Sequence, residues 1–326
     1  MKAIGGIMTS ADLARYKAVE REPVRSTYRG YDVIGMPPPS SGGVHVGQIL
    51  NILEQFDLGG MTDVDRTHVM AEAMKLAFAD RAHWLGDPDL APVPRGLIDP
   101  EYVKQLSAKI DLKRATPVES HGRPPRAAED VFGKKHTTHI AAADAAGNWV
   151  AITTTVNTAF GSKVIVPGTG VVLNNQMDDF SIEPGLPNHF KLIGAEANAV
   201  APGKRPLSSM SPTIVLKDGR PILTVGAAGG PTIITQVVLT VSNHVDLGDD
   251  IAAALKRPRI HHQWRPDELR VDKTMDERII RALEAKGHPV KPIAPTGATN
   301  GIAQPEASAP LIDASEPRGE GKAAGQ

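Results

Sequence analysis

The sequence lacks cysteine altogether, which excludes disulfide bonds, thiolate metal sites and thiol nucleophiles. An oxidising compartment is as compatible with that absence as a reducing one, so the compartment stays open. Charge of one sign is not in excess either: 36 Lys and Arg residues face 37 Asp and Glu residues, for a formal net charge of -1. No strong field therefore attracts nucleic acid or an anionic membrane surface, and we expect neither partner.

Long hydrophobic runs are also missing. No window reaches the roughly 18 apolar residues that a membrane-spanning helix needs, so we expect no membrane span. The first ten residues are too short and too polar for a signal peptide. What the sequence does have is 326 residues, 41% of them hydrophobic, which suffices for the core of one large domain or two ordinary ones. Its 31 glycines and 27 prolines predict many turns and ordered loops.

The first third of the sequence predicts helices. Thr9 and Asp12 fit a capping box. Two later helices are indicated by apolar residues at helical spacing, the first with Val46, Ile49, Leu50 and Leu53, the second with Met70, Met74, Ala77, Phe78 and Leu85. A third helix begins with Asp99 as its cap and runs to Ile110. Residues 111–135 carry charge and three prolines without any sustained period, and predict an exposed linker.

From position 138 the pattern changes to strands. Residues 139–144 and 149–156 predict a hairpin, because Thr, Val and Ile concentrate in its second strand. Further strands are expected at 170–175, 212–216 and 221–225, the last two joined by an Asp218-Gly219 turn. Helices are then expected at 232–245, 250–256 and 276–286. Helices, then strands, then helices again predict a layered α+β fold.

A family resemblance comes from the segment KKHTTHIAAADAAGNWVAITTTVNTAFGS at 134–162. By local pattern alone its Thr pair is an ordinary strand start. The segment resembles the γ-glutamyltranspeptidase family, in which a Thr followed by Thr-His opens the mature small subunit after the precursor cuts itself. Further motifs of that family are LNNQMDDFS, KRPLSSMSPT, GAAGG and PRIHHQWRPDEL. DLARYKAVEREPV, YRGYDVIGMPPPSSGG and FADRAHWLGDPD resemble the end of its large subunit, so the likeness covers residues 5–326.

The resemblance implies an N-terminal nucleophile (Ntn) hydrolase fold, an αββα sandwich of two sheets between helical layers, here with N-terminal elements missing. Residues 1–136 correspond to the C-terminal part of the large subunit, ending in a linker, and residues 137–326 to the catalytic small subunit, together one folding unit. The family's precursor has a further N-terminal portion, which supplies core strands and an Arg that clamps the substrate's α-carboxylate. We expect either a truncated or split gene product with a separately encoded N-terminal half, or a degenerate relative.

The chemistry implied by the resemblance depends on Thr137. A Thr hydroxyl is a weak nucleophile, but as residue one it gains an α-amino group of pKa about 7.7 to 8.0 that acts as its base. Before that, Thr137 Oγ is expected to attack the carbonyl of His136, and hydrolysis of the resulting ester frees Thr137 as residue one. The same hydroxyl then acts on substrate. By resemblance Thr155 orients Thr137 from the neighbouring strand, and Gly229 and Gly230 donate oxyanion-hole N–H groups. By local pattern these three are a strand residue and a strand-to-helix turn.

The substrate pocket is implied in the same way. A γ-glutamyl group presents a free α-carboxylate and a free α-ammonium, so it needs donors on one side and an acid on the other. The resemblance assigns the ammonium to Asn157, Gln176 and Asp179, and the carboxylate to Ser208 and Ser209. Without it, Asp178-Asp179 reads as a solvated loop pair and the two serines as a turn. Arg205 precedes the serines but matches a different position of the family.

Residues 184–195 correspond to the family's lid, with Phe190 as its gating aromatic; by pattern alone they form a long surface loop. No metal is expected, because His136/His139 and His261/His262 lack the HExxH spacing. No cofactor is expected.

The implied function is that of an acyltransferase and hydrolase of glutathione metabolism, made as a self-cleaving zymogen. Thr137 takes the glutamyl group from glutathione or a related amide as an ester and passes it to water, an amino acid or a peptide. Two alternatives stay open: a cephalosporin or glutaryl acylase, whose substrate lacks the α-ammonium, and an inactive remnant that serves only as a binding or assembly partner. The resemblance suggests a periplasmic or secreted location for full-length relatives, while the location of this chain stays unknown.

Overall fold

The computed structural model of the chain describes residues 1, 5–125, 139–294, 297–319 and 321–325. The cleavage site predicted between His136 and Thr137 lies outside the described residues. Among the helices of the described ranges, none combines the length and the apolar character that crossing a membrane requires.

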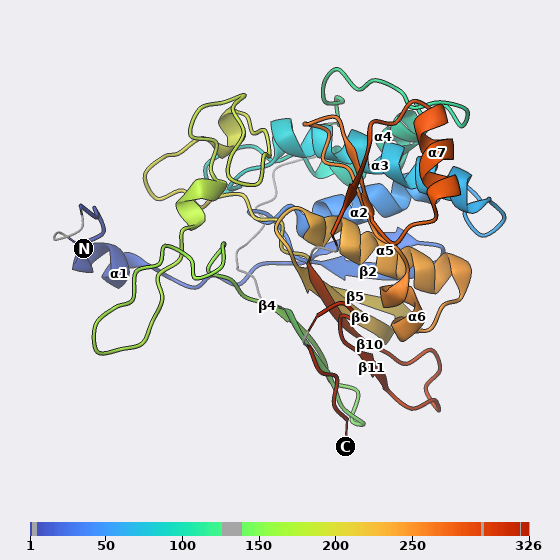
Figure 1. The fold of residues 1–326 in the computed structure, drawn as a ribbon. Coiled ribbons are helices and arrows are strands. Elements are labelled where there is room, and N and C mark those ends of the chain that lie inside the picture. Colours follow the sequence, from blue (N-terminus) through green and yellow to red (C-terminus); the bar gives the residue numbers. More distant parts are fainter. Residues whose placement is uncertain (2–4, 126–138, 295–296, 320, 326) are drawn as a thin grey trace.

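A six-stranded antiparallel sheet forms the centre of the molecule (Figure 1). Its strand order is β1-β2-β5-β6-β10-β11. The first two strands come from the segment before the predicted cleavage site and the other four from the segment after it. The bounds are β1 Val24–Tyr28, β2 Tyr31–Gly35, β5 Thr213–Lys217, β6 Arg220–Ala228, β10 Ala298–Ala303 and β11 Ile312–Ala314. The two segments therefore share one sheet.

The hairpin of β1 and β2 corrects the expectation that the first third is helical. Arg29 and Gly30 connect the strands and both have positive φ, 52° and 79°, which suits the tight turn that matches the twist of a hairpin. Alternate residues Val24, Tyr28 and Val33 are buried. Strand alternation with a turn was thus present in the sequence, but the turn is not one of the common Asn-Gly or Asp-Gly pairs.

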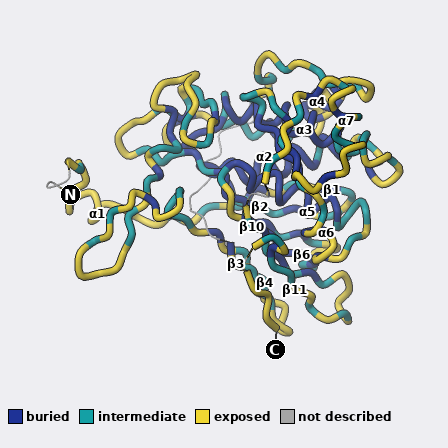
Figure 2. Tube along the Cα trace, in the orientation of Figure 1, coloured by how far each residue is buried: buried dark blue, intermediate teal, exposed yellow. Residues whose placement is uncertain are grey.

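Helices cover one face of the central sheet. Helix α2 (Gly42–Leu53) and helix α5 (Thr232–Leu247) pack on it, and α3 (Asp63–Trp84) and α4 (Pro100–Ser107) pack on α2. Asp99 caps α4 as predicted, accepting hydrogen bonds from two backbone N–H groups. Helix α1 (Ser10–Arg15) has the predicted capping box and no buried residue, and Figure 2 shows it away from the buried core. The remaining helices are α6 (Ile251–Lys256), α7 (Glu277–Ala285) and the 3-10 helices η2 (Arg95–Ile98), η3 (Gln176–Asp179) and η4 (Glu196–Asn198).

The predicted hairpin after the linker lies on the opposite face of the sheet. It consists of β3 (His139–Ala143) and β4 (Trp149–Thr153), both in contact with β6. Inward residues alternate with outward ones, and the outward Ile140 and Ile152 are 55% and 49% exposed. Within the described ranges, the structure therefore contains helices, sheet and hairpin, while the second helical layer of an αββα sandwich is not seen over this hairpin.

A second, three-stranded sheet packs beside α3. It consists of β7 (Ile260–His261), β8 (Leu269–Asp272) and β9 (Val290–Ile293). Gly287, at φ 93°, follows α7 and turns the chain toward β9, as expected of a residue just past a helix end.

One expected strand was wrong, and the predicted linker makes hydrogen bonds that its sequence does not indicate. Residues 170–175 form no strand but only an isolated bridge, between Ile165 and Val172, because positive-φ glycines at 168 and 170 interrupt the extended backbone. The described part of the predicted linker, 111–125, has no buried residue, as expected, but it is hydrogen-bonded to α3. Thr116 N donates to Glu72 at 3.0 Å, and Trp84 Nε1 donates to Gly122 O at 3.2 Å. Backbone hydrogen bonds, which no hydrophobic period reveals, hold this segment onto α3.

Candidate active site

A cavity of about 580 Å³ lies where β6 runs into α5. Eight of the residues that the sequence singled out line it: Thr155, Asn157, Asp179, Phe190, Ser208, Ser209, Gly229 and Gly230. Gln176 is buried on η3 and is not among the lining residues. Residues from five separate stretches of the chain therefore meet around one space.

The glycine turn forms one wall of this cavity. Gly229 and Gly230 lie between β6 and α5, with φ of 136° and 60°. A Cβ on Gly230 would come within 2.8 Å of the Phe190 ring, so both the backbone conformation and the contact favour glycine. The turn leads into the N-terminus of α5, where the partial positive charge of a helix gathers. This wall is suited to stabilise a developing negative charge.

Thr155 does not lie on a strand, because β4 already ends at Thr153. Its Oγ1 accepts a hydrogen bond of 2.8 Å from Asn157 N. Asn157 has a φ of 77° and donates through Nδ2 to Asn175 O at 3.3 Å. The chain thus leaves β4 in a tight, hydrogen-bonded turn that brings both side chains to the cavity.

His139 begins β3 and is the first residue described after the predicted nucleophile. It is buried, with Nδ1 at 3.1 Å from Thr153 Oγ1. A Cβ on Gly226 of β6 would overlap its ring, so the ring packs directly on that glycine. Burial lowers the pKa of His139 to about 4, which keeps the imidazole neutral at pH 7. The start of β3 is thereby fixed against the strand that leads to Gly229.

Asp179 forms the acidic side of the cavity. Its backbone oxygen accepts a hydrogen bond of 2.8 Å from Asn198 Nδ2, which fixes the end of η3. Desolvation raises the pKa of the Asp179 carboxyl to about 7; the charge of Arg81 acts in the opposite direction, and Asp178 raises the pKa further. A cationic ligand group next to this buried carboxyl would strongly stabilise its ionised form.

The cavity also contains an arginine that the sequence analysis did not predict. Arg81 of α3 is 3% exposed and also lines the cavity. Its Nε donates to Ser41 Oγ at 2.9 Å and its Nη2 to Ser209 Oγ at 3.0 Å. Ser41 in turn donates through N and Oγ to Ser208 O, at 2.9 and 2.8 Å. Arg205, by contrast, donates to Lys17 O.

One signal for Arg81 was present in the sequence. The residue follows Phe78 by three positions and precedes Leu85 by four, so it falls on the apolar face of its own helix. A charge on such a face requires a buried partner.

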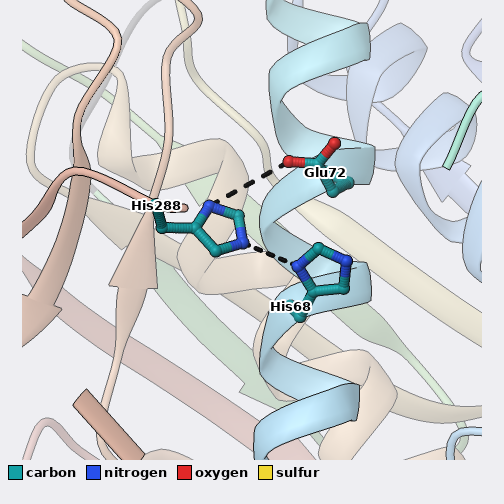
Figure 3. A group of neighbouring side chains, drawn as sticks. All are labelled: His68, Glu72 and His288. Atoms are coloured by element: carbon teal, nitrogen blue, oxygen red, sulfur yellow. Dashed lines mark hydrogen bonds and ion pairs between the residues drawn. The ribbon is translucent and has the colours of Figure 1, made fainter. Parts of the chain in front are cut away.

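A second group of buried titratable side chains lies apart from the cavity. Figure 3 shows His68 and Glu72 on α3 pointing toward His288. His68 Nδ1 is 2.7 Å from His288 Nε2, and His288 Nδ1 is 4.0 Å from Glu72 Oε1. Lys75 Nζ, 2.6 Å from Glu72 Oε1, already neutralises that carboxylate, so a dication would have to displace it. The arrangement fits a hydrogen-bonded cluster between the two segments of the chain.

The fold is that of the Ntn hydrolases. The cephalosporin acylase from Bacillus halodurans matches 99% of this chain and 56% of its own, with a TM-score of 0.87 and 30% identity. The family model for Gamma-glutamyltranspeptidase matches residues 1–326, and the chain belongs to this family.

Relatives in this family have two kinds of name. The glutathione hydrolase proenzyme of Escherichia coli (strain K12) is 49% identical over 322 residues, which are 98% of this chain and 55% of the relative. The acylase ACY 1 proenzyme of Pseudomonas sp. (strain SE83) is 39% identical over 293 residues, 89% of this chain and 49% of the relative. The chain thus spans about half the length of these curated relatives. Family and fold predictions are confirmed.

Proposed function

We propose that this chain carries the catalytic part of a γ-glutamyltransferase and glutathione hydrolase. The observation that supports it best is the charge arrangement of the cavity. Arg81 and Asp179 interact electrostatically, yet they form no ion pair among the described residues. A cation and an acid that line one cavity without forming an ion pair suit the two charged groups of an α-amino acid. The glycine turn beside them suits the carbonyl that reacts.

In the proposed reaction, Thr137 Oγ attacks the γ-carbonyl of the donor and its proton passes to the α-amino group of the same residue. The tetrahedral oxyanion is stabilised by Gly229 and Gly230 N–H, while Thr155 orients Thr137. The C–N bond then breaks, the amine leaves with the proton, and a glutamyl ester remains. Water or an amine of an amino acid or peptide resolves the ester, which gives hydrolysis or transfer. Processing at His136-Thr137 uses the same hydroxyl.

For the substrate, the proposal gives Asn157, Gln176 and Asp179 to the α-ammonium, and Ser208 and Ser209 to the α-carboxylate. Gln176 is buried on the same 3-10 helix as Asp179, so its proposed contribution to the ammonium site comes from behind the residues that line the cavity. Phe190, packed against Gly230, covers the pocket as its lid. The donor is glutathione or a related γ-glutamyl amide.

A glutaryl or cephalosporin acylase is the second candidate. It is supported by the similarity to the Bacillus halodurans enzyme and to acylase ACY 1. A glutaryl group has no ammonium for Asp179 to bind, so this candidate leaves a buried acid without a role. The test compares γ-glutamyl and glutaryl p-nitroanilides with the purified chain. Preference for the γ-glutamyl donor supports the proposal; equal turnover or preference for glutaryl contradicts it.

A further N-terminal segment, in a longer protein or as a separately encoded half, is proposed as partner of the β3–β4 hairpin. The outward Ile140 and Ile152 form an apolar strip that such a segment would cover, and the relatives are about twice as long as this chain. If so, adding the N-terminal half of the E. coli relative should raise the melting temperature and reduce binding of an apolar dye. No change in either would contradict the proposal.

A further inference from the structure

Arg81 differs in its contacts from three arginines of the described chain that are only partly buried. Arg29 pairs with Asp246, Arg259 with Glu316 and Arg318 with Asp272. Arg81 pairs with no carboxylate of the described residues and donates only to the hydroxyls of Ser41 and Ser209.

A buried guanidinium normally has a counter-charge, because neutral hydroxyls do not repay the loss of its hydration. Desolvation lowers the pKa of Arg81 to about 10, so the group remains protonated at neutral pH. The positive charge is therefore present at the wall of the cavity, and no carboxylate of the described residues forms an ion pair with it. An anionic ligand group would supply the missing partner.

The hydrogen-bond directions indicate how the charge reaches the ligand. Ser209 Oγ accepts from Arg81, which occupies a lone pair and leaves its O–H free to donate. No described acceptor takes that O–H, and Ser209 lines the cavity. Through Ser41, the same guanidinium also fixes the backbone oxygen of Ser208. Arg81 thereby orders both serines that face the donor.

We propose that Arg81 is the positioning residue for the donor's α-carboxylate: it holds Ser209 Oγ as acceptor, directs the Ser209 O–H at the carboxylate and supplies the positive charge behind it. The inference rests on the proposed function, since it assumes a donor with an α-carboxylate. It assigns the cationic interaction with the α-carboxylate to a residue of this chain. The family resemblance implied such a cation only in the further N-terminal portion of the family's precursor.

The test uses three anilides that differ by one charged group. γ-Glutamyl p-nitroanilide has both groups, glutaryl p-nitroanilide has only the carboxylate, and 4-aminobutanoyl p-nitroanilide has only the ammonium. Arg81→Met should lower kcat/KM, mainly through KM, by about thirtyfold or more for the two carboxylate donors. Turnover of 4-aminobutanoyl p-nitroanilide should change little. An equal loss for all three donors would mean that Arg81 has only a structural role.

Two further variants keep the test decisive if Arg81→Met folds poorly. Ser209→Ala should show the same selectivity for carboxylate donors, and combining it with Arg81→Lys should add little to its loss, because both act through one hydrogen bond. Additive losses would contradict the proposal. Arg205→Met, outside the cavity, is the matched control and should leave all three rates unchanged.

A pH profile gives an independent readout. The charge of Arg81 lowers the pKa of Asp179, while Asp178 raises it. The Arg81→Met change should therefore raise the pKa of Asp179. The pH below which the ratio of γ-glutamyl to glutaryl kcat/KM falls should move upward with it. A structural defect would lower the rates without moving that pH. Failure of wild type to use γ-glutamyl p-nitroanilide would overturn the proposed function itself. Normal wild-type turnover with an unchanged Arg81→Met profile would overturn only this inference.

Discussion

At the scale of single residues, Thr137 should determine both processing and catalysis. Wild type is expected to yield chains of 136 and 190 residues, Thr137→Ala to stay whole, and Thr137→Ser to be cut, since Ser keeps the hydroxyl that attacks the His136 carbonyl. Intact mass with N-terminal sequencing measures this. A host protease would cut all three proteins alike, and that result would remove Thr137 from the mechanism.

Asp179 should give the γ-glutamyl reaction its own acid limb. The carboxyl must be ionised to bind the α-ammonium, and its pKa of about 7 means that protonation competes as the pH falls below that value. The ratio of kcat/KM for γ-glutamyl to that for glutaryl p-nitroanilide should therefore fall about tenfold per pH unit well below 7. Taking the ratio cancels the titration of the Thr137 α-amine, which affects both donors.

Removing the Asp179 carboxylate tests the same contact at fixed pH. Asp179→Ala should cost about 2 to 5 kcal/mol, roughly thirtyfold to several thousandfold in kcat/KM for the γ-glutamyl donor. Cleavage of the chain should continue, because processing involves no free glutamyl group. Loss of both cleavage and turnover would show that Asp179→Ala is misfolded. In that case the nearly isosteric Asp179→Asn tests the ammonium contact: its kcat/KM for the γ-glutamyl donor should show the same loss while cleavage continues.

At the scale of elements, α3 carries two buried charge systems, Arg81 at the cavity and the Glu72–Lys75 pair below it. Lys75→Met leaves the buried Glu72 carboxylate without its cation, which should lower the free energy of unfolding by about 3 to 5 kcal/mol near pH 8. The loss should be smaller near pH 6, because His288 can take up a proton once the lysine charge that opposes it is gone. Urea unfolding at the two pH values measures both effects.

A double variant provides the control for that prediction. In Glu72→Gln with Lys75→Met, the Gln oxygen still accepts the Thr116 N–H, and no uncompensated charge remains. Most of the stability should return. If the double variant is less stable than Lys75→Met, packing rather than charge dominates this cluster.

The sequence predicted elements best where a local device marks their ends. Capping residues at Thr9 and Asp99 and the Asp218-Gly219 turn all have their expected roles. The β1–β2 hairpin was missed because its Arg29-Gly30 turn carries a weak signal. The predicted strand at 170–175 was wrong because a short apolar run does not by itself distinguish a strand from a loop.

For the candidate site, the residues that line the cavity came from family motifs, not from periodicity. Ser208, Ser209 and Asp179 look like turn and loop residues until the fold brings them together from separate stretches. Arg81 was different: its place on an apolar helix face was readable from Phe78 and Leu85, but its partners Ser41 and Ser209 lie 40 and 128 positions away. Tertiary contacts of that span leave no trace in local sequence.

At the scale of the whole molecule, four buried histidines should make the fold sensitive to acid. Desolvation lowers the pKa of His45, His261 and His288 to about 3 and that of His139 to about 4, against an ordinary value of 6.5. Below about 6.5 the unfolded chain binds protons that the folded chain does not, so stability present at neutral pH is lost as the pH falls. Each such histidine contributes at most about 1.4 kcal/mol per pH unit.

Asp179 acts in the opposite direction, since its raised pKa lets the folded state hold a proton between about 4 and 7, but it offsets only one histidine. Denaturant unfolding from pH 7 to pH 4 measures the balance, and a constant or rising free energy of unfolding would contradict it. His261→Gln should flatten the slope by up to one proton.

The shared central sheet has a consequence for kinetics. Strand β2 pairs with β5 from Asp32↔Leu216 to Gly35↔Thr213, so the main chain on one side of the predicted cut is hydrogen-bonded to the main chain on the other. The uncut Thr137→Ala protein should regain its structure after dilution from urea at a rate independent of protein concentration. Cut protein must first bring two molecules together, so its recovery should be second order, and halving the concentration should double its half-time. Processing would then convert a fold that can be re-formed by one molecule alone into one that, once lost in dilute solution, is slow to return.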